Sequence, residues 1–185
     1  MRPEAPVYQA YLSWSRARAL TAGTRERQMA ELSLRAVWHA LFDPCPQLRG
    51  LCPPDAADLF ERFLDQAEEA RCSMGWSLHL HLLEWVLREP RYGPQVTEGM
   101  IIEALAAAAS RWAIYDKSLS GGLVLGCQRL GDRVVAGWKC HTPEEVRGVT
   151  LLRLETAPQL EHFLAFFTVP GFEVESLGPW AAIPR

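Results

Sequence analysis

The pattern of apolar and polar positions changes its period once along the chain, near residues 118–122. Before this point apolar residues recur every three or four positions, which predicts α-helices, and after it they alternate with the period of two that is typical of strands. We therefore predict an α+β fold, in which an N-terminal antiparallel bundle of about five helices packs on a small, mainly antiparallel C-terminal sheet. A single domain is expected over residues 1–185, with a helical layer over 1–116 and a sheet-bearing layer over 117–185.

Turn and capping residues separate the predicted helices. Thr24 and Asp55 are suited to accept hydrogen bonds from the first N–H groups of a helix, and Gly23 is suited to the left-handed turn beyond a helix end. The short links between the third, fourth and fifth helices predict antiparallel neighbours. The predicted helices cover residues 6–21, about 24–42, about 97–114 and 76–88, and a further helix that Asp55 caps carries its apolar stripe to Ala67.

The sheet-bearing part opens with a predicted β-hairpin. Its strands are Leu123–Leu130 and Arg133–Cys140, with Gly131-Asp132 as a two-residue turn. Pairing Leu130 with Arg133 places Leu125 opposite Trp138 on one apolar face and Val124 opposite Lys139 on a more polar face. A one-residue slip would mix the two faces, so the pattern favours this register.

Two capping boxes follow the hairpin and predict two helices. They are Thr142-Pro143-Glu144-Glu145 and Thr156-Ala157-Pro158-Gln159. A strand is predicted between them over Val149–Leu154, and a last strand over Phe172–Leu177. The predicted order is therefore five helices followed by β-β-α-β-α-β.

Composition favours a folded core over nucleic-acid or membrane binding. About half of the residues are apolar and under a quarter are charged, and the seven tryptophans suggest a tight core, a binding surface, or both. A net charge of −3 gives no overall basic field, and no apolar run is long enough to cross a bilayer. The five cysteines are odd in number and lack C-x-x-C spacing, and no secretory signal opens the chain. We expect reduced thiols in a cytoplasmic protein, or inside the host cell for a viral source.

No metal or cofactor is predicted. His79 and His81 are two positions apart, so on a helix they point to different faces and do not converge with Cys72 on one ion. Cys45 and Cys52 bracket a proline-rich loop, but six residues separate them and no second ligand pair follows. Packed or flanking side chains are the preferred interpretation of all five.

Catalytic candidates are equally sparse. Cys140 and His141 with Glu144 form the nearest approach to an activated nucleophile, because a helix N-terminus would stabilise a thiolate there. Adjacent residues on a strand point apart, however, so a core cysteine is preferred. The segment 118–122 leads from a helix into a strand, whereas phosphate-binding loops lead into a helix, so we interpret it as a connector.

Two sets of residues are candidates for binding other macromolecules. The first helices carry arginines beside aromatic residues, which is a pattern that can bind nucleic acid, although Glu26 interrupts the run. Aromatic residues near both ends and in the hairpin are candidates for a protein partner. The arginines are Arg16, Arg18, Arg25 and Arg27, and the aromatic candidates are Tyr11, Trp14, Trp138 and Trp180.

The sequence favours a non-enzymatic interaction protein, such as an adaptor, an assembly chaperone, an immunity-type inhibitor or a phage or viral accessory factor. Its partner would be another protein or a second copy, bound through the free edge or outer face of the hairpin. The first alternative is a small enzyme or ligand-binding domain, with a site between the helices and the sheet around His79, Trp112, Cys140 and His141. The second is nucleic-acid binding through the arginine-rich helices.

Overall fold

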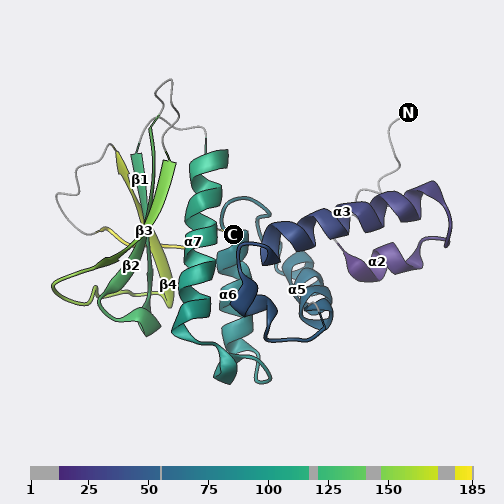
Figure 1. The fold of residues 1–185 in the computed structure, drawn as a ribbon, viewed down its shortest axis with the longest axis horizontal. Coiled ribbons are helices and arrows are strands. Elements are labelled where there is room, and N and C mark those ends of the chain that lie inside the picture. Colours follow the sequence, from purple (N-terminus) through teal and green to yellow (C-terminus); the bar gives the residue numbers. More distant parts are fainter. Residues whose placement is uncertain (1–12, 55, 117–120, 141–146, 171–177, 185) are drawn as a thin grey trace. The chain divides into compact units, whose positions relative to one another are not determined.

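The computed structural model describes residues 13–54, 56–116, 121–140, 147–170 and 178–184. The predicted fold class is confirmed: the helices lie in the N-terminal part of the chain, and an antiparallel sheet of five strands lies at the C-terminus (Figure 1). The chain divides into two compact units, which comprise Met1–Cys72 and Ser73–Arg185.

The first unit is helical. The N-cap Ser13 accepts a hydrogen bond from the N–H of Arg16, and Thr24 does the same for the N–H of Arg27, as predicted for Thr24. Gly23 adopts the predicted left-handed backbone, with φ of 80°. Asp55 lies outside the described residues, and Ala56 is the N-cap residue of the helix that begins at Ala57. The helices are α2 (Trp14–Ala19), α3 (Arg25–Phe42), α4 (Pro46–Arg49) and α5 (Ala57–Glu69).

The core of the first unit forms where the apolar stripes of α3 and α5 are buried. Phe42 of α3 meets Phe60 of α5 edge to face, with 6.2 Å between ring centroids. Phe63 and Leu64 of α5 are almost fully buried as well. The stripe predicted for this helix is therefore its buried face.

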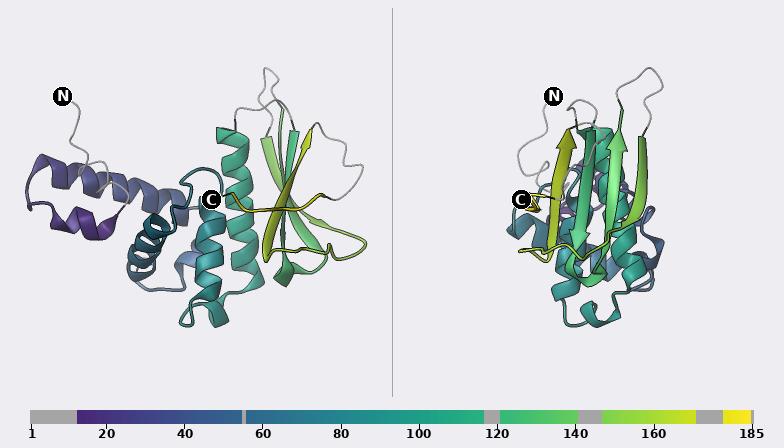
Figure 2. Two further views of the ribbon diagram at one scale, coloured as in Figure 1. Left: turned by 180° about the vertical axis from the view of Figure 1, so that it is seen from behind. Right: turned by 90° about the vertical axis from the view of Figure 1, so that its left-hand side faces the viewer.

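In the second unit, α7 (Glu98–Tyr115) lies between α6 (Leu78–Arg88) and the sheet (Figures 1 and 2). Thr97 caps α7, and a short 3-10 turn, Gly93–Gln95, precedes it. Helix α6 is apolar almost all round, and its buried residues from Leu78 to Val86 confirm the predicted central helix.

The sheet has the strand order β3-β2-β1-β4-β5, and every neighbouring pair is antiparallel. One face packs on α7. Gly137 lies against Ala109 of this helix: a Cβ on Gly137 would lie 2.9 Å from the Cβ of Ala109, so a larger residue there would force the backbone to move. The strands are β1 (Gly121–Cys127), β2 (Arg133–Lys139), β3 (Arg147–Arg153), β4 (Leu164–Pro170) and β5 (Ala181–Ala182).

The predicted hairpin exists, but its predicted register is wrong. Leu125 pairs with Val135 and not with Trp138, which pairs with Gly122 instead. The reason is that a 3-10 turn, Gln128–Leu130, and Gly131 lengthen the connection between the strands beyond two residues. The register shifts by an odd number of positions, so Leu125 and Trp138 lie on opposite faces of the sheet.

The helix predicted after Thr156 is also wrong. The chain from 155 to 163 is irregular, and the following apolar residues form β4, which pairs with β1 along its whole length. The strand predicted over Val149–Leu154 is confirmed as β3. The capping box from Thr142 to Glu145 and the strand predicted over Phe172–Leu177 both lie outside the described residues. No described helix has the length and apolar character needed to cross a membrane.

Candidate functional site

Strand β3 forms one edge of the sheet, and β2 is its only strand neighbour in the described part of the chain. The hairpin was predicted to offer a free edge, but this is corrected by the structure, because β4 covers β1 and β3 covers β2. The exposed edge on this side of the sheet therefore belongs to β3 and not to the hairpin.

The edge of β3 is long and weakly protected. Its centre, Gly148–Leu152, contains no charged residue. Leu151 and Leu152 point to opposite faces of the sheet and remain 44% and 42% exposed. Charged residues stand only at the two ends, where Arg153 pairs with Asp132 at 3.0 Å. Edge strands usually carry a charge, a proline or a bulge that prevents pairing, so this composition is typical of a strand that pairs with another chain.

Trp138 lies beside this edge. It pairs with Gly148 of β3, and a Cβ on Gly148 would come within 2.2 Å of the indole ring. The ring therefore lies directly over the glycine and stays half-buried. This predicted partner-binding residue thus lies next to the edge of β3.

Trp180 packs against its own unit. Its ring meets Phe167 edge to face at 4.8 Å and covers a cluster that includes Val124 and Val134, on the sheet face away from α7. It also contacts the position of Gly126, where a Cβ would lie 3.0 Å from the indole. The C-terminal tail is thereby held on the sheet.

The space between α7 and the sheet contains a buried cation that the sequence did not suggest. Lys139 is 1% exposed, and its Nζ lies 2.5 Å from Asp116 Oδ1, 2.7 Å from the carbonyl oxygen of Asp116 and 4.5 Å from the ring centroid of Trp112. These contacts satisfy the ammonium and account for its burial. The site is a structural ion pair that ties the end of β2 to the end of α7.

The candidate nucleophile, Cys140, is the residue that follows Lys139 in the chain. Cys140 follows β2 as a half-buried reduced cysteine, and its proposed partners His141 and Glu144 lie outside the described residues. His79 is fully buried on α6. Cys127, in contrast, is buried on β1, and burial raises the pKa of its thiol, although contacts near Arg129 oppose this. It is therefore protonated and unreactive at neutral pH.

The residues considered for metal binding stay apart. His81 contacts the hydroxyl of Ser77 at 3.3 Å, while Cys45 and Cys52 are buried in the first unit. In the described ranges no three side chains of the ligating types are close enough to bind one ion.

The arginines of the first two helices are largely neutralised. Arg16 pairs with Glu68 at 2.5 Å, and Arg18 pairs with Glu61 at 2.7 Å and lies over the ring of Trp14. Arg27 pairs with Glu31 at 2.6 Å, which leaves Arg25 as the exposed member of the four without a described acidic partner. A nucleic-acid surface needs free positive charge, so these pairs weigh against that interpretation.

Of the remaining aromatic candidates, Tyr11 lies outside the described residues. Trp14 stands on α2, where it packs edge to face on Phe60 at 6.2 Å and stays half-buried.

Among curated proteins, none matches the sequence. A family model does match, over residues 7–184, and its description is methanobactin biosynthesis cassette protein MbnC-like. The match spans nearly the whole chain and both units, and the chain therefore belongs to the MbnC-like family.

Proposed function

We propose that this chain is a non-enzymatic protein-binding subunit, which acts together with another protein of a methanobactin biosynthesis cassette. The family description supports the pathway, and a cassette groups proteins that serve one product. The observation that carries the binding role is the edge of β3, with its uncharged centre and its exposed Leu151 and Leu152.

An edge of this kind binds by β-augmentation. A partner segment in extended conformation hydrogen-bonds to the outward N–H and C=O groups of β3, and its alternate side chains contact the two faces of the sheet. Leu151 is available on the α7 side and Leu152 on the other, and Trp138 extends that second face. The main chain supplies affinity, and these three side chains supply selectivity.

The test is binding to each of the other proteins encoded in the same cassette, purified one at a time. We expect one of them to form a complex of fixed stoichiometry, as measured by light scattering coupled to size exclusion and by calorimetric titration. If none binds with a dissociation constant below about 100 µM, which corresponds to about 5.5 kcal/mol, the proposed function is wrong.

A proline scan then separates the edge from the rest of the surface. In an antiparallel strand, adjacent residues direct their N–H groups alternately toward the neighbouring strand and away from it. Proline has no N–H group, so one of the two variants Thr150→Pro and Leu151→Pro removes a hydrogen bond to β2, whereas the other removes an N–H group that points outward from the edge. The variant that leaves stability unchanged should lower the affinity at least tenfold. An unchanged affinity in that variant would show that the complex forms elsewhere.

A further inference from the structure

A groove with a volume of about 760 Å³ lies in the first unit, with walls from α2, α3 and α5. Trp14 comes from α2 and Trp38 from α3, and both remain half-buried. Leu34 and Phe60 are almost fully buried, whereas Leu32 is 58% exposed. The apolar residues of the lining are Trp14, Leu32, Leu34, Trp38, Ala57 and Phe60.

This surface has the features of a binding site for protein. Apolar patches bordered by polar groups mark interaction sites on soluble domains, and tryptophan and arginine are the residues that most often dominate binding energy. The exposure of Leu32 shows that the groove is open to solvent. Small-ligand pockets bury about 70–90% of their ligand, so an open groove suits a segment of protein better.

The acids on the groove wall are already paired. Glu31 of α3 lies 2.6 Å from Arg27, and Glu61 of α5 lies 2.7 Å from Arg18. Each of these carboxylates is thus neutralised by an arginine of the same unit. The groove therefore presents no free negative charge from these two residues.

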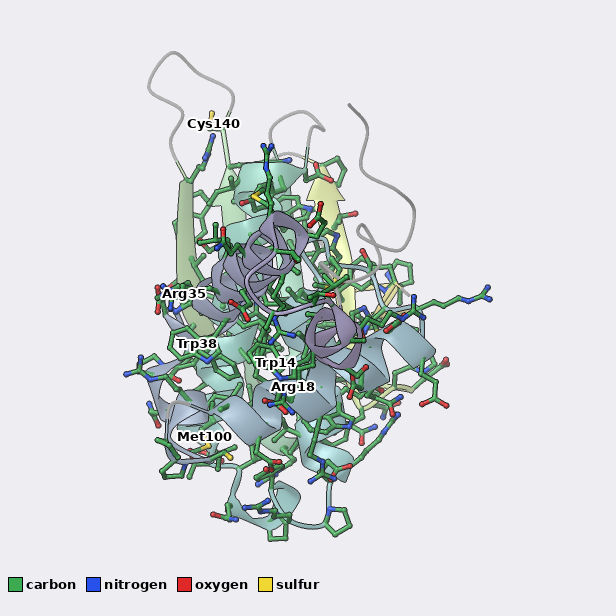
Figure 3. All side chains as sticks on the ribbon, turned by 90° about the vertical axis from the view of Figure 1, so that its right-hand side faces the viewer. Trp14, Arg18, Arg35, Trp38, Met100 and Cys140 are labelled. Atoms are coloured by element: carbon green, nitrogen blue, oxygen red, sulfur yellow. The ribbon has the colours of Figure 1, made fainter. Side chains whose placement is uncertain are left out.

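Arg35 provides the opposite charge. Its side chain is exposed on the groove wall and, within the described ranges, has no acidic partner. Arg35 and Trp38 are three positions apart on α3 and both line the groove, while Arg18 lies over the ring of Trp14 (Figure 3). Among the described residues that line the groove, Arg35 adds a guanidinium to an apolar floor, while Arg49, which does not line the groove, lies 5.9 Å from the ring centroid of Trp38. A guanidinium binds a carboxylate with two parallel hydrogen bonds, which makes it selective for that group.

We propose that this groove binds a helical protein segment that presents large apolar side chains and, one turn away, a carboxylate. The apolar side chains contact Trp14, Trp38 and Leu32, and the carboxylate pairs with Arg35. A helix binds in an apolar groove through its own residues at spacings of three and four, so such a segment can present its apolar side chains and its carboxylate on one face.

This inference goes beyond the proposed function. The groove belongs to the first unit and the edge of β3 to the second, so each surface is tested separately. The two also differ in chemistry, because the edge binds an extended main chain and the groove binds side chains.

The experiment uses the full chain and two fluorescein-labelled helical peptides on an alanine–glutamine scaffold. Both carry Trp and Leu four positions apart, and they differ only at flanking positions, which are Glu in one and Lys in the other. Fluorescence anisotropy should show that the Glu peptide binds about tenfold more tightly than the Lys peptide. The Glu side chain is attracted to Arg35 and the Lys side chain is repelled by it, and together these two effects can reach the difference of about 1.4 kcal/mol that corresponds to tenfold.

Variants assign the preference to the groove. Arg35→Glu should abolish or invert the preference, and Leu32→Ser should weaken the binding of both peptides severalfold. Arg25→Glu is the matched control, because Arg25 is exposed on the same helix and does not line the groove. It should leave the preference unchanged, and the β3 proline variants should do so too.

Several results would overturn the proposal. These are equal affinity for the two peptides, no binding of either at 1 mM protein, or the same response to Arg25→Glu as to Arg35→Glu. Binding that appears only when residues 1–12 are removed would show that the chain itself occupies the groove. Self-association that Arg35→Glu abolishes, without peptide binding, would assign the groove to a second copy.

Discussion

Lys139 places a positive charge between β2 and α7, and two acceptor atoms and one aromatic ring make its burial tolerable. Lys139→Ala should lower the free energy of unfolding by about 2–3 kcal/mol, because the carboxylate of Asp116 loses its partner and the stem of the side chain is lost. Lys139→Met should cost only about 1 kcal/mol, since it keeps the apolar stem. Urea unfolding measures both values. Equal losses in the two variants would mean that the apolar stem contributes nothing and that the loss of the charge accounts for the whole effect.

Cys127 predicts a pH dependence on the alkaline side. Burial raises the pKa of its thiol, so in the folded chain the group stays protonated where the unfolded chain has already lost its proton. The unfolded state then binds fewer protons, and stability falls as the pH rises above the ordinary pKa of a thiol, by at most about 1.4 kcal/mol per pH unit. Below that pH the contribution is fully present.

The measurement compares urea unfolding of the parent chain and of Cys127→Ala between pH 7 and pH 10. The difference in stability between the two proteins should shrink as the pH rises. A difference that stays constant over this range would contradict the assignment. Cys127 is the suitable target because the other buried thiols lie in the first unit.

At the level of the elements, the contact between α7 and the sheet depends on Gly137. A Cβ there would lie 2.9 Å from the Cβ of Ala109 and 3.3 Å from its carbonyl oxygen, so helix and sheet would have to separate. Gly137→Ala should cost about 1–3 kcal/mol, the usual range for overpacking. The loss would appear in thermal or urea unfolding.

Gly122→Ala is the matched control, because a Cβ on Gly122 would meet its neighbours at 3.6 Å or more, which is ordinary contact. We expect this change to alter stability by less than about 1 kcal/mol. Adding Ala109→Gly to Gly137→Ala should restore part of the loss despite the lower helix propensity of glycine. An unaltered loss in the double variant would place the strain elsewhere.

Local signals predicted the helices well and the sheet less well. Thr24 caps α3 because capping is a matter of a few adjacent residues. The residues after Thr156 carry a helical start signal too, but there pairing of β4 with β1 overrides it. The predicted hairpin register is wrong only because the connection between the strands is longer than two residues. The turn after Cys127 shifts the pairing, and Lys139 therefore lies on the face that packs on α7 and not on the opposite face, as predicted.

The candidate site shows the same limit. Trp138 could be singled out from the sequence as an aromatic residue of the predicted hairpin, but its position beside an edge depends on β3, which pairs with β2. The groove on α3 was not predicted at all. The lining residues on α3 and those on α5 are about thirty positions apart in the sequence, and no local sequence pattern indicates which helices pack together.

For the molecule as a whole, the sequence predicts one domain with two layers, in which helices give way to strands after residue 116. The two compact units of the structure meet in the chain at Cys72 and Ser73, so α6 and α7 are in the same unit as the sheet. The reason is physical: one face of the sheet, with Leu123, Leu125 and Val135 fully buried, is covered by α7. A sheet with a bare apolar face is not stable alone.

This difference predicts how fragments behave. Residues 73–185 expressed alone should fold, with dispersed amide resonances and a cooperative thermal transition, because the second unit retains α7 over the sheet and α6 behind it. Residues 117–185 alone should aggregate or stay unfolded, since the face that α7 covers would be exposed to water and Lys139 would lose both Asp116 and Trp112. If the shorter fragment gives the same dispersed spectrum, the sheet does not depend on α7 and the division after residue 116 is the better one. If the longer fragment also fails to fold, the second unit is compact only in the presence of the first.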